Sequence, residues 1–434
     1  MKNLTLENIA KVCSGTYFGS ESLKDKTISG VVIDSRKVEK DFLFVAVKGA
    51  KVDGHKFIPD VMEKGAAAVL SEQKLENPVG PYILVENTLE ALKQLAEYYR
   101  KSLDIKVVGI TGSVGKTSTK EMIASVLGEK FNVLKTEGNF NNEIGLPLTI
   151  FRLREEHEVA VLEMGISEFG EMHRLATMAN PDVCVITNIG LCHLENLKTR
   201  DGILKAKTES FSHMKENGTA ILNGDDDKLS SIKEVNGKSP VFYGISEKME
   251  YADADCKKAV YATDIENLGL FGVKACIHTE TGTFEVKIPI PGEHNVYNAL
   301  AATATGLTLG LTLSEIKSGI EKAKTINGRT NIMDVDGMTV IDDCYNANPV
   351  SMKASIDVLA MAEGRKIAVL GDMGELGADE KKLHYEVGTY LAKKKIDVLF
   401  CAGELSKEMM RALQEENAAI LAFYFETREE MTKE

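Results

Sequence analysis

Residues 105–118 read IKVVGITGSVGKTS, and this stretch decides the fold. Its apolar first part, residues 105–110, predicts a buried strand, and residues 120–127 predict a helix shortly after it. A glycine-rich turn between a strand and a helix lets backbone N–H groups curl around a phosphate, and the helix N-terminus adds partial positive charge. The stretch therefore predicts a phosphate-binding loop in an α/β sheet. A glycine turn that happens to precede a lysine is the alternative.

Two side chains of this loop have defined tasks in phosphate binding. Lys116 is expected to reach the β- and γ-phosphates of a nucleotide, and the Thr117 hydroxyl is expected to bind Mg²⁺. Ile110 stands where the usual GxxxxGK[ST] pattern has its first glycine, so the match is to the shorter TGxxGKT form. The expected nucleotide-binding residues of the loop are Thr111, Gly112, Ser113, Val114, Gly115, Lys116, Thr117 and Ser118.

Alternating strand and helix patterns continue over the rest of the chain. Its 434 residues are enough for about three domains. Residues 1–103 predict a small α/β domain, residues 104–326 a central, doubly wound and mostly parallel sheet, and residues 327–434 a Rossmann-like α/β domain. The last segment stops after a charged, helix-like stretch without a closing strand, which is the pattern expected of a truncated carboxyl end.

The composition excludes several classes of protein. The net charge of −13, from 52 Lys+Arg against 65 Asp+Glu, disfavours general nucleic-acid binding. Seven cysteines without CxxC spacing argue against a disulfide framework and a structural zinc site. Neither a signal peptide nor a membrane-spanning stretch is visible, so we expect a cytoplasmic protein that does not associate with membranes.

Polar side chains follow two further apolar strands, where open α/β sheets bind their ligands. Glu163 comes directly after residues 159–162 and could bind Mg²⁺, although a surface glutamate that caps the next helix would look the same. His193 follows residues 183–186 and could approach a second cation, whereas a lone histidine there is more often structural. Lys207 by itself reads as a solvated helix lysine.

Eight segments together resemble the Mur ligases of bacterial cell-wall synthesis, over nearly the whole chain. They are TGSVGKTSTKEM, EGNFNNEIGLPLT, EMGISEFGEMHRL, TNIGLCHLENL, AKTES, PGEHNVYNALAA, DDCYNANPVSM and GDMGELG. Within this family, YNANPVSM and GDMGELG favour the member that uses ATP to join D-alanyl-D-alanine to UDP-N-acetylmuramoyl-tripeptide through an acyl phosphate. The resemblance implies these small-molecule substrates and a monomeric enzyme with no nucleic-acid or membrane partner.

The resemblance also assigns ATP and two magnesium ions to named residues. The expected metal ligands are Thr117, Glu163, His193 and Lys207. Because a bare ammonium would repel Mg²⁺, Lys207 is expected as a carbamate, which carries a carboxylate on a long arm. Asn295 and Asn298 are expected at the adenine, and Arg329 at the ATP phosphates once the third domain closes. Residues 324–328 are a candidate hinge for this closure, with an ordinary linker turn as the alternative. The expected catalytic residues are Lys116, Lys207, His193 and Arg329.

The substrate-binding residues implied by the resemblance fall in three places. The segment 34–36 resembles the part of the family that holds the UDP-sugar, and segment 343–348 is expected to face the incoming dipeptide. The full set is Asp34, Ser35, Arg36, Asn139, Asn142, Asp343, Tyr345, Asn346 and Asn348. Two departures stand out: Cys192 replaces the usual Ala, and the family's final strand with its Lys-Gly-Ser-Arg-like segment is missing after Glu434.

Three other functions stay open at this point. A sibling ligase would add diaminopimelate or lysine, but the third domain lacks a DNPR-like segment. A folate-type polyglutamate ligase shares the architecture but fits YNANPVSM poorly. A nucleotide-gated switch would hydrolyse ATP without an amine acceptor, so amine-dependent phosphate release separates it from a ligase.

Overall fold

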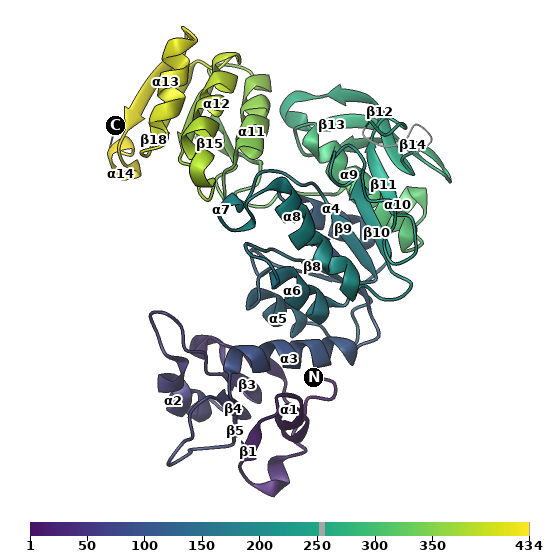
Figure 1. Cartoon of the computed structure of the whole chain (residues 1–434), viewed down its shortest axis with the longest axis vertical. Helices are drawn as coiled ribbons and strands as arrows, with labels where there is room; N and C mark the ends of the chain where they lie inside the picture. Colours follow the sequence, from purple (N-terminus) through teal and green to yellow (C-terminus); the bar gives the residue numbers. More distant parts are fainter. Residues whose placement is uncertain (251–256, 434) are drawn as a thin grey trace.

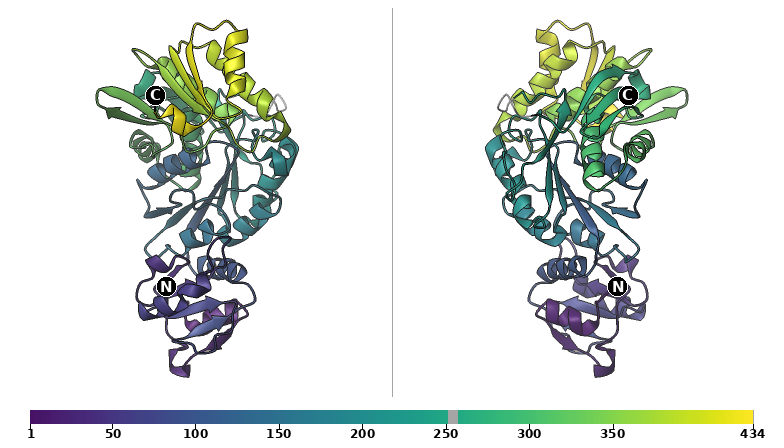
Figure 2. Two further views of the ribbon diagram at one scale, coloured as in Figure 1. Left: turned by 90° about the vertical axis from the view of Figure 1, so that its left-hand side faces the viewer. Right: turned by 90° about the vertical axis from the view of Figure 1, so that its right-hand side faces the viewer.

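The computed structural model describes residues 1–250 and 257–433, so Cys256 and Glu434 lie outside the described residues. Three units follow one another along the long axis of the molecule in the order of the sequence (Figure 1). Two side views show the same order, with the central unit between the other two (Figure 2). This α/β arrangement confirms the predicted fold class.

The amino-terminal unit is built on a five-stranded sheet of order β1-β5-β4-β3-β2. Its strands run parallel except β1, which is antiparallel to β5. The strands are β1 (Thr16–Phe18), β2 (Gly30–Val32), β3 (Phe42–Val45), β4 (Ala68–Ser71) and β5 (Tyr82–Leu84). The α-helices are α1 (Leu6–Val12), α2 (Ile58–Glu63) and α3 (Thr88–Lys101), and the 3-10 helices are η1 (Glu21–Leu23), η2 (Ser35–Lys37) and η3 (Gly54–Phe57).

Helix α3 packs between the amino-terminal unit and the central unit. Asn87 caps its first turn by accepting a hydrogen bond from the Glu90 N–H, which satisfies a backbone donor that has no partner within the helix. Its buried face includes Leu92 and Leu95, and the Tyr99 hydroxyl donates to the Leu153 carbonyl at 2.6 Å. One apolar core therefore continues from the amino-terminal unit into the central unit.

The central unit contains a nine-stranded sheet of order β14-β13-β12-β11-β10-β9-β6-β8-β7. Strands β6 to β12 run parallel to their neighbours, and β12, β13 and β14 pair antiparallel at one edge. The strands are β6 (Lys106–Thr111), β7 (Val133–Lys135), β8 (Val159–Glu163), β9 (Val183–Ile186), β10 (Thr219–Asn223), β11 (Val241–Ile245), β12 (Val260–Asn267), β13 (Val273–Thr279) and β14 (Gly282–Ile288).

Helices cover both faces of the parallel part, which explains its continuous apolar runs. Val108 and Ile110 of β6 belong to the core under one face, whereas Val107 belongs to the core under the other. The first face carries α4 (Lys116–Leu127), α9 (His294–Thr308) and α10 (Leu313–Glu321). The remaining helices are α5 (Gly145–Ile150), α6 (Glu171–Ala179), α7 (Leu194–Leu197) and α8 (Arg200–Thr208), with the 3-10 helices η4 (Glu209–His213) and η5 (Gly269–Phe271).

The carboxy-terminal unit combines a hairpin with a three-stranded parallel sheet of order β17-β18-β19. Apolar side chains of this sheet remain exposed, Val369 at 60% and Leu421 at 55%. The strands are β15 (Asn331–Val335), β16 (Met338–Asp342), β17 (Ile367–Gly371), β18 (Val398–Ala402) and β19 (Leu421–Phe425). The helices are α11 (Pro349–Met361), η6 (Gly377–Asp379), α12 (Glu380–Ala392), α13 (Lys407–Glu415) and α14 (Arg428–Met431).

The sheets fall within the three predicted segments, while the boundaries after residues 103 and 326 stay predictions. Within residues 1–250 and 257–433, no helix combines the length and apolarity needed to cross a bilayer. Because β6, β8 and β9 are adjacent and parallel, their carboxyl ends meet at one edge of the sheet. The phosphate loop, Glu163 and the segment that leads to His193 therefore all start from this edge.

Candidate active site

The phosphate loop joins β6 directly to α4, as the sequence predicts. Gly115 stands at the N-cap of α4 with φ +82°, and Gly112 has φ +151°, both in the region that favours glycine. The Lys116 ammonium folds back over the loop and donates to the Gly112 carbonyl at 2.8 Å and the Ser113 carbonyl at 3.3 Å. Loop and helix terminus together form a cradle for an anion.

A neighbouring strand braces the loop through residues that sequence reasoning missed. The Val114 N–H donates to Asn188 Oδ1 at 3.0 Å, and Asn188 Nδ2 donates back to the Val114 carbonyl at 3.0 Å. The Thr187 hydroxyl donates to the same carbonyl at 2.6 Å. Both residues directly follow β9, which pairs with β6. Their position after a buried strand could therefore have predicted that they lie at the ligand-binding edge of the sheet.

The two loop glycines predict unequal effects on stability. A Cβ at Gly112 would lie 1.9 Å from Thr187 Oγ1, whereas a Cβ at Gly115 meets nothing closer than 3.8 Å. We expect Gly112→Ala to cost about 2–5 kcal/mol, from backbone strain and overpacking together. Gly115→Ala should cost about 1–2 kcal/mol, from backbone strain alone. Urea unfolding of both variants measures the difference, and equal losses would contradict the packing described here.

Glu163 lies at the end of β8, beside the first turn of α4. One carboxylate oxygen, Oε1, accepts from the Thr117 hydroxyl at 3.1 Å and from Asn141 Nδ2 at 2.8 Å. The other, Oε2, is buried without a hydrogen bond and lies 3.9 Å from the Lys120 ammonium. The side chain is only 1% exposed, so the alternative of a surface glutamate is wrong. Sequence reasoning missed Asn141 and Lys120 at this position.

This corner has the chemistry that Mg²⁺ requires. Mg²⁺ prefers carboxylate and hydroxyl oxygens, and a buried carboxylate oxygen without a partner is a costly group unless a ligand uses it. Thr117 and Glu163 therefore fit the predicted ion. Among residues 1–250 and 257–433, no three His, Cys, Asp or Glu side chains form a ready-made metal cluster.

His193 faces the carboxy-terminal unit. It precedes α7 with φ +49°, and its Nδ1 lies 2.6 Å from Oε2 of Glu375. Burial lowers the pKa of His193; Glu375 acts in the opposite direction, and the positive charges of Lys207 and Lys116 lower the pKa further. Sequence reasoning named Glu375 only as part of a family segment and gave it no role.

Lys207 is buried in α8, with 1% of its surface exposed. Burial, reinforced by the charge of Lys116, lowers the pKa of Lys207 to about 7. In the described part of the chain its ammonium has neither a hydrogen bond nor an ion pair. The interpretation of Lys207 as a solvated helix lysine is therefore wrong, because Lys207 lies on the buried face of α8.

Asn295 and Asn298 connect α9 to the phosphate-loop helix. Asn298 accepts from the Thr119 hydroxyl at 2.7 Å and donates to Asn295 Oδ1 at 2.8 Å. Asn295 in turn donates to the Pro291 carbonyl at 2.8 Å. The two predicted adenine residues thus lie beside the loop and hold α4 and α9 together.

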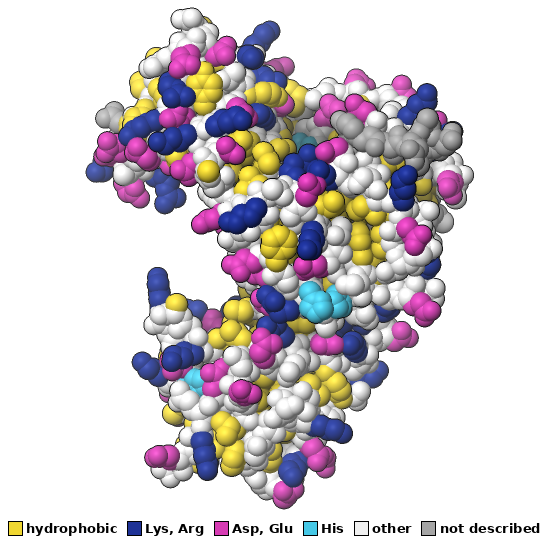
Figure 3. Space-filling view, in the orientation of Figure 1, with side chains coloured by type: hydrophobic (Ala, Val, Ile, Leu, Met, Phe, Trp, Pro, Cys, Tyr) yellow, Lys and Arg dark blue, Asp and Glu magenta, His cyan; other side chains and the backbone are white. Residues whose placement is uncertain are grey.

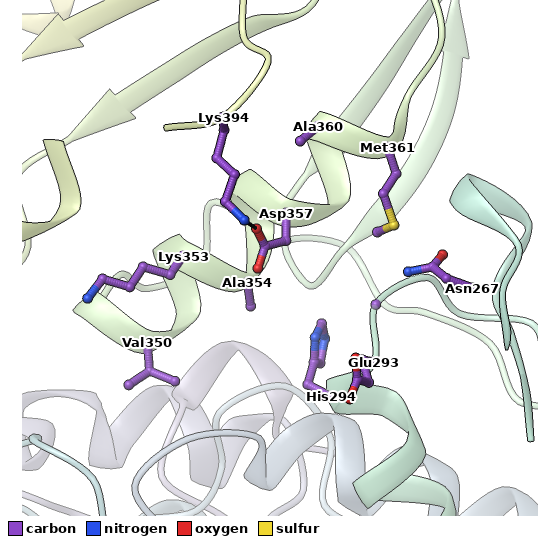
Figure 4. A pocket seen from close by; sticks show the side chains of 11 residues that line it. Asn267, Glu293, His294, Val350, Lys353, Ala354, Asp357, Ala360, Met361 and Lys394 are labelled. Atoms are coloured by element: carbon purple, nitrogen blue, oxygen red, sulfur yellow. Dashed lines mark ion pairs between the residues drawn. The ribbon is translucent and has the colours of Figure 1, made fainter. Parts of the chain in front are cut away.

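A cavity of about 540 Å³ lies between the start of α9 and one side of α11, and its α9 wall is made by Glu293 and His294. Figure 4 shows His294 pointing into it from α9 and the ion pair of Lys394 with Asp357 across from it. The Lys394 ammonium lies 2.6 Å from Asp357 Oδ1. The cavity therefore lies between the central and carboxy-terminal units.

The carboxy-terminal residues predicted to bind substrate form a loop against the hinge segment. The Arg329 guanidinium lies 4.3 Å from the centre of the Tyr345 ring, an attractive cation–π contact. Asp343 accepts from the Thr330 N–H at 3.1 Å, and Asn348 caps α11 by accepting from two backbone N–H groups. Asn346 accepts from the adjacent Ala347 N–H at 2.9 Å. In this conformation Arg329 is thus held by its own unit.

The other predicted substrate residues lie in the amino-terminal unit and in one loop of the central unit. Asp34 caps η2, and the bidentate contact from Arg36 lowers the pKa of Asp34 to about 2. Ser35 belongs to the same short helix. Asn139 and Asn142 are in the loop between β7 and α5, where Asn142 accepts from the Gly145 N–H at 2.8 Å. A broad hollow separates the amino-terminal and carboxy-terminal units on the face shown in Figure 3.

This combination of a phosphate loop, a parallel sheet edge and a facing third unit defines a class of enzyme. The chain matches the Mur ligase family catalytic domain over residues 27–100, the Mur ligase middle domain over 110–306 and the Mur ligase glutamate ligase domain over 328–434. The chain belongs to the Mur ligase family and is an ATP-dependent ligase, which confirms the resemblance found in its segments.

Curated relatives give a narrower comparison. The chain is 41% identical over 406 residues to UDP-N-acetylmuramoyl-tripeptide–D-alanyl-D-alanine ligase of Bacillus subtilis (strain 168), covering 92% of this chain and 85% of the relative. It is 35% identical over 413 residues to the ligase of the same name from Escherichia coli (strain K12), covering 95% and 88%.

Solved structures agree with these relatives. MurF from Acinetobacter baumannii superposes with a TM-score of 0.89 at 33% identity, covering 99% of this chain and 91% of that chain. MurF ligase from Thermotoga maritima, solved in complex with ADP, gives a TM-score of 0.77 at 31% identity, covering 92% and 94%.

Proposed function

We propose that this chain joins D-alanyl-D-alanine to UDP-N-acetylmuramoyl-tripeptide, with ATP converted to ADP and phosphate. The observation that carries the proposal is the corner of Lys116, Thr117 and Glu163 at the sheet edge. His193, which feels the charge of Lys116, contacts Glu375 of the third unit. The names of the curated relatives support the choice of substrates. The product is the UDP-N-acetylmuramoyl-pentapeptide, a precursor of peptidoglycan.

The first step activates the tripeptide. Its terminal carboxylate oxygen attacks the γ-phosphorus of ATP, the bond to the β-phosphate oxygen breaks, and an acyl phosphate and ADP result. Lys116 neutralises charge that develops on the transferred group, and the backbone N–H groups of the first turn of α4 orient the phosphates. Magnesium, when bound, would supply further positive charge that stabilises the transferred phosphoryl group. Thr117 and Glu163 are the residues that would hold the first ion, and His193 and carbamylated Lys207 would hold the second.

The second step forms the amide bond. The amine of D-alanyl-D-alanine attacks the acyl carbon and phosphate leaves. Because water would destroy the acyl phosphate, the third unit must close over it, with residues 324–328 as the hinge. In that closed state Arg329 leaves Tyr345 and contacts the phosphates. The cavity between α9 and α11 is lined by His294, which precedes Asn295 in the chain, and would accept the adenine side of the nucleotide.

Two further assignments belong to this proposal. The segment 34–36 of the amino-terminal unit, with Asn139 and Asn142, binds the UDP-sugar end of the tripeptide substrate. The enzyme acts as a monomer in the cytoplasm. The six described cysteines, which leave out Cys256, are all free thiols, and this supports the assignment to the reducing cytoplasm.

Phosphate release tests the proposed function. Purified protein receives ATP, Mg²⁺ and UDP-N-acetylmuramoyl-tripeptide, with and without D-alanyl-D-alanine. The proposal expects release that requires both substrates. Phosphate release that does not depend on D-alanyl-D-alanine points to an ATP switch. Release that instead requires diaminopimelate or lysine, together with the UDP-sugar dipeptide precursor, points to a sibling ligase.

A further inference from the structure

The GDMGELG segment, residues 371–377, forms a loop that the proposed mechanism leaves without a task. It follows β17 at the carboxyl end of the third sheet and contacts α7 of the central unit. A Cβ added at Gly377 would lie 3.8 Å from the Glu195 backbone nitrogen, so the loop comes close to the residues around His193. Figure 1 shows α7 beneath the carboxy-terminal unit at this contact.

The loop is held rigidly on both sides of Glu375. Met373 and Leu376 are buried, at 1% and 3% exposure, and anchor it in the third core. Buried His384 shares its Nδ1–H with the Glu380 carbonyl at 2.7 Å, which leaves its Nε2 to accept from the Met373 N–H at 2.8 Å. Glu375 itself has φ +60°, an unusual backbone angle for a glutamate that these anchors maintain.

The two acidic side chains of the loop differ in what they do. Asp372 has a structural role, because its carboxylate holds the neighbouring loop through hydrogen bonds. It accepts from the Ser406 N–H and hydroxyl, each at 2.7 Å, and from the Leu405 N–H at 3.2 Å. Glu375 projects away from the core, with its side chain 62% exposed. Its Oε2 contacts His193, while its Oε1 has no hydrogen bond among the residues that the structure describes.

An anion at this position is chemically useful for the second substrate. The α-amino group of a dipeptide has a pKa of about 7.7–8.0, so the dipeptide arrives mostly as an ammonium. On the central side it meets the Lys116 ammonium, whose charge is close enough to lower the pKa of His193. A carboxylate from the third unit, aimed at the same spot, attracts the ammonium and holds it near the acyl carbon.

We propose that Glu375 binds the amino group of the incoming D-alanyl-D-alanine and positions it for attack, an inference that rests on the proposed ligase function. Oε2 stays with His193 and Oε1 accepts a hydrogen bond from the amino group. This group attacks after it has lost one proton to water, so closure of the third unit delivers the amine and its anchor together. Glu375 is thereby a substrate-binding residue, and the GDMGELG loop supplies part of the dipeptide site.

The test is steady-state kinetics of Glu375→Gln, which keeps the shape and removes the charge. We expect the KM for D-alanyl-D-alanine to rise about 10- to 100-fold, the range for loss of a charge-assisted hydrogen bond. The KM values for ATP and tripeptide, the Mg²⁺ requirement and the thermal midpoint should stay unchanged. Glu415→Gln, the same change at a half-exposed glutamate of α13, is the matched control and should behave as wild type.

Two results would overturn the proposal. One is an unchanged KM for D-alanyl-D-alanine in Glu375→Gln. The other is a raised Mg²⁺ requirement as the only change, which would mean that Glu375 serves to position His193 and does not bind the dipeptide. Failure of the proposed function looks different, because the wild-type protein would then release no phosphate in response to the dipeptide.

Discussion

Lys116→Ala is expected to lower kcat by about 10³-fold, the loss typical of removing a preorganised positive group from a phosphoryl-transfer site. The ammonium in the structure already lies over the phosphate loop, donating to two of its carbonyls. When ATP enters, these weak internal contacts are exchanged for charged oxygens, and the interaction is strongest in the transition state. The loss should therefore appear in kcat and not only in the KM for ATP.

A control on the same strand separates this effect from general damage. Lys106→Ala removes a lysine at the opposite end of β6, where it pairs with Asp182 and is 62% exposed. We expect wild-type turnover from that variant and a thermal midpoint close to wild type from both. A Lys116→Ala enzyme with more than a tenth of normal kcat would contradict the role given to this residue.

Lys207→Met is expected to lower activity by about 10²- to 10³-fold, because a ligand to a metal that stabilises phosphate charge contributes several kcal/mol. The pKa of Lys207 near 7 keeps part of the amine neutral at physiological pH. A neutral amine can attack CO2, forming an N–C bond and releasing a proton, and the product is a carbamate. Since the neutral fraction rises as the pH rises through 7, carbamate formation should increase between pH 6 and 8.

Carbon-13 NMR with labelled bicarbonate observes this group directly. The wild-type protein should show a carbamate resonance that Lys207→Met lacks. Lys205→Met, at an exposed position of the same helix, should keep both the resonance and the activity. A resonance that survives in Lys207→Met would place the modification elsewhere, and full activity of that variant would remove Lys207 from the site.

The parts of the site that sequence reasoning found are those with a local pattern. The phosphate loop is readable because strand, glycines and helix are contiguous, and Glu163 because it ends an apolar strand. The roles of Asn188 and Asn141 could not be predicted, because they depend on which strands become neighbours. A local sequence pattern does not determine how strands pair across a sheet. Lys207 was misread without the family resemblance because burial of a helix face is decided by what packs against it.

Contacts between units were the least predictable. Arg329 carries no local sign that it stacks on Tyr345, and nothing near Glu375 indicates that it meets His193. Such pairs join residues far apart in the chain, and they depend on how the third unit sits on the second. The residue types still indicate that GDMGELG is a functional segment, because this segment is among those that resemble the Mur ligases.

The most direct test of the account is the mass of the product. The protein is incubated with ATP, Mg²⁺, UDP-N-acetylmuramoyl-tripeptide and D-alanyl-D-alanine, and the nucleotide-sugar is analysed by mass spectrometry. The account predicts a single new species heavier by one dipeptide minus water, absent when ATP is omitted. Conversion of ATP to ADP with the tripeptide mass unchanged would contradict it.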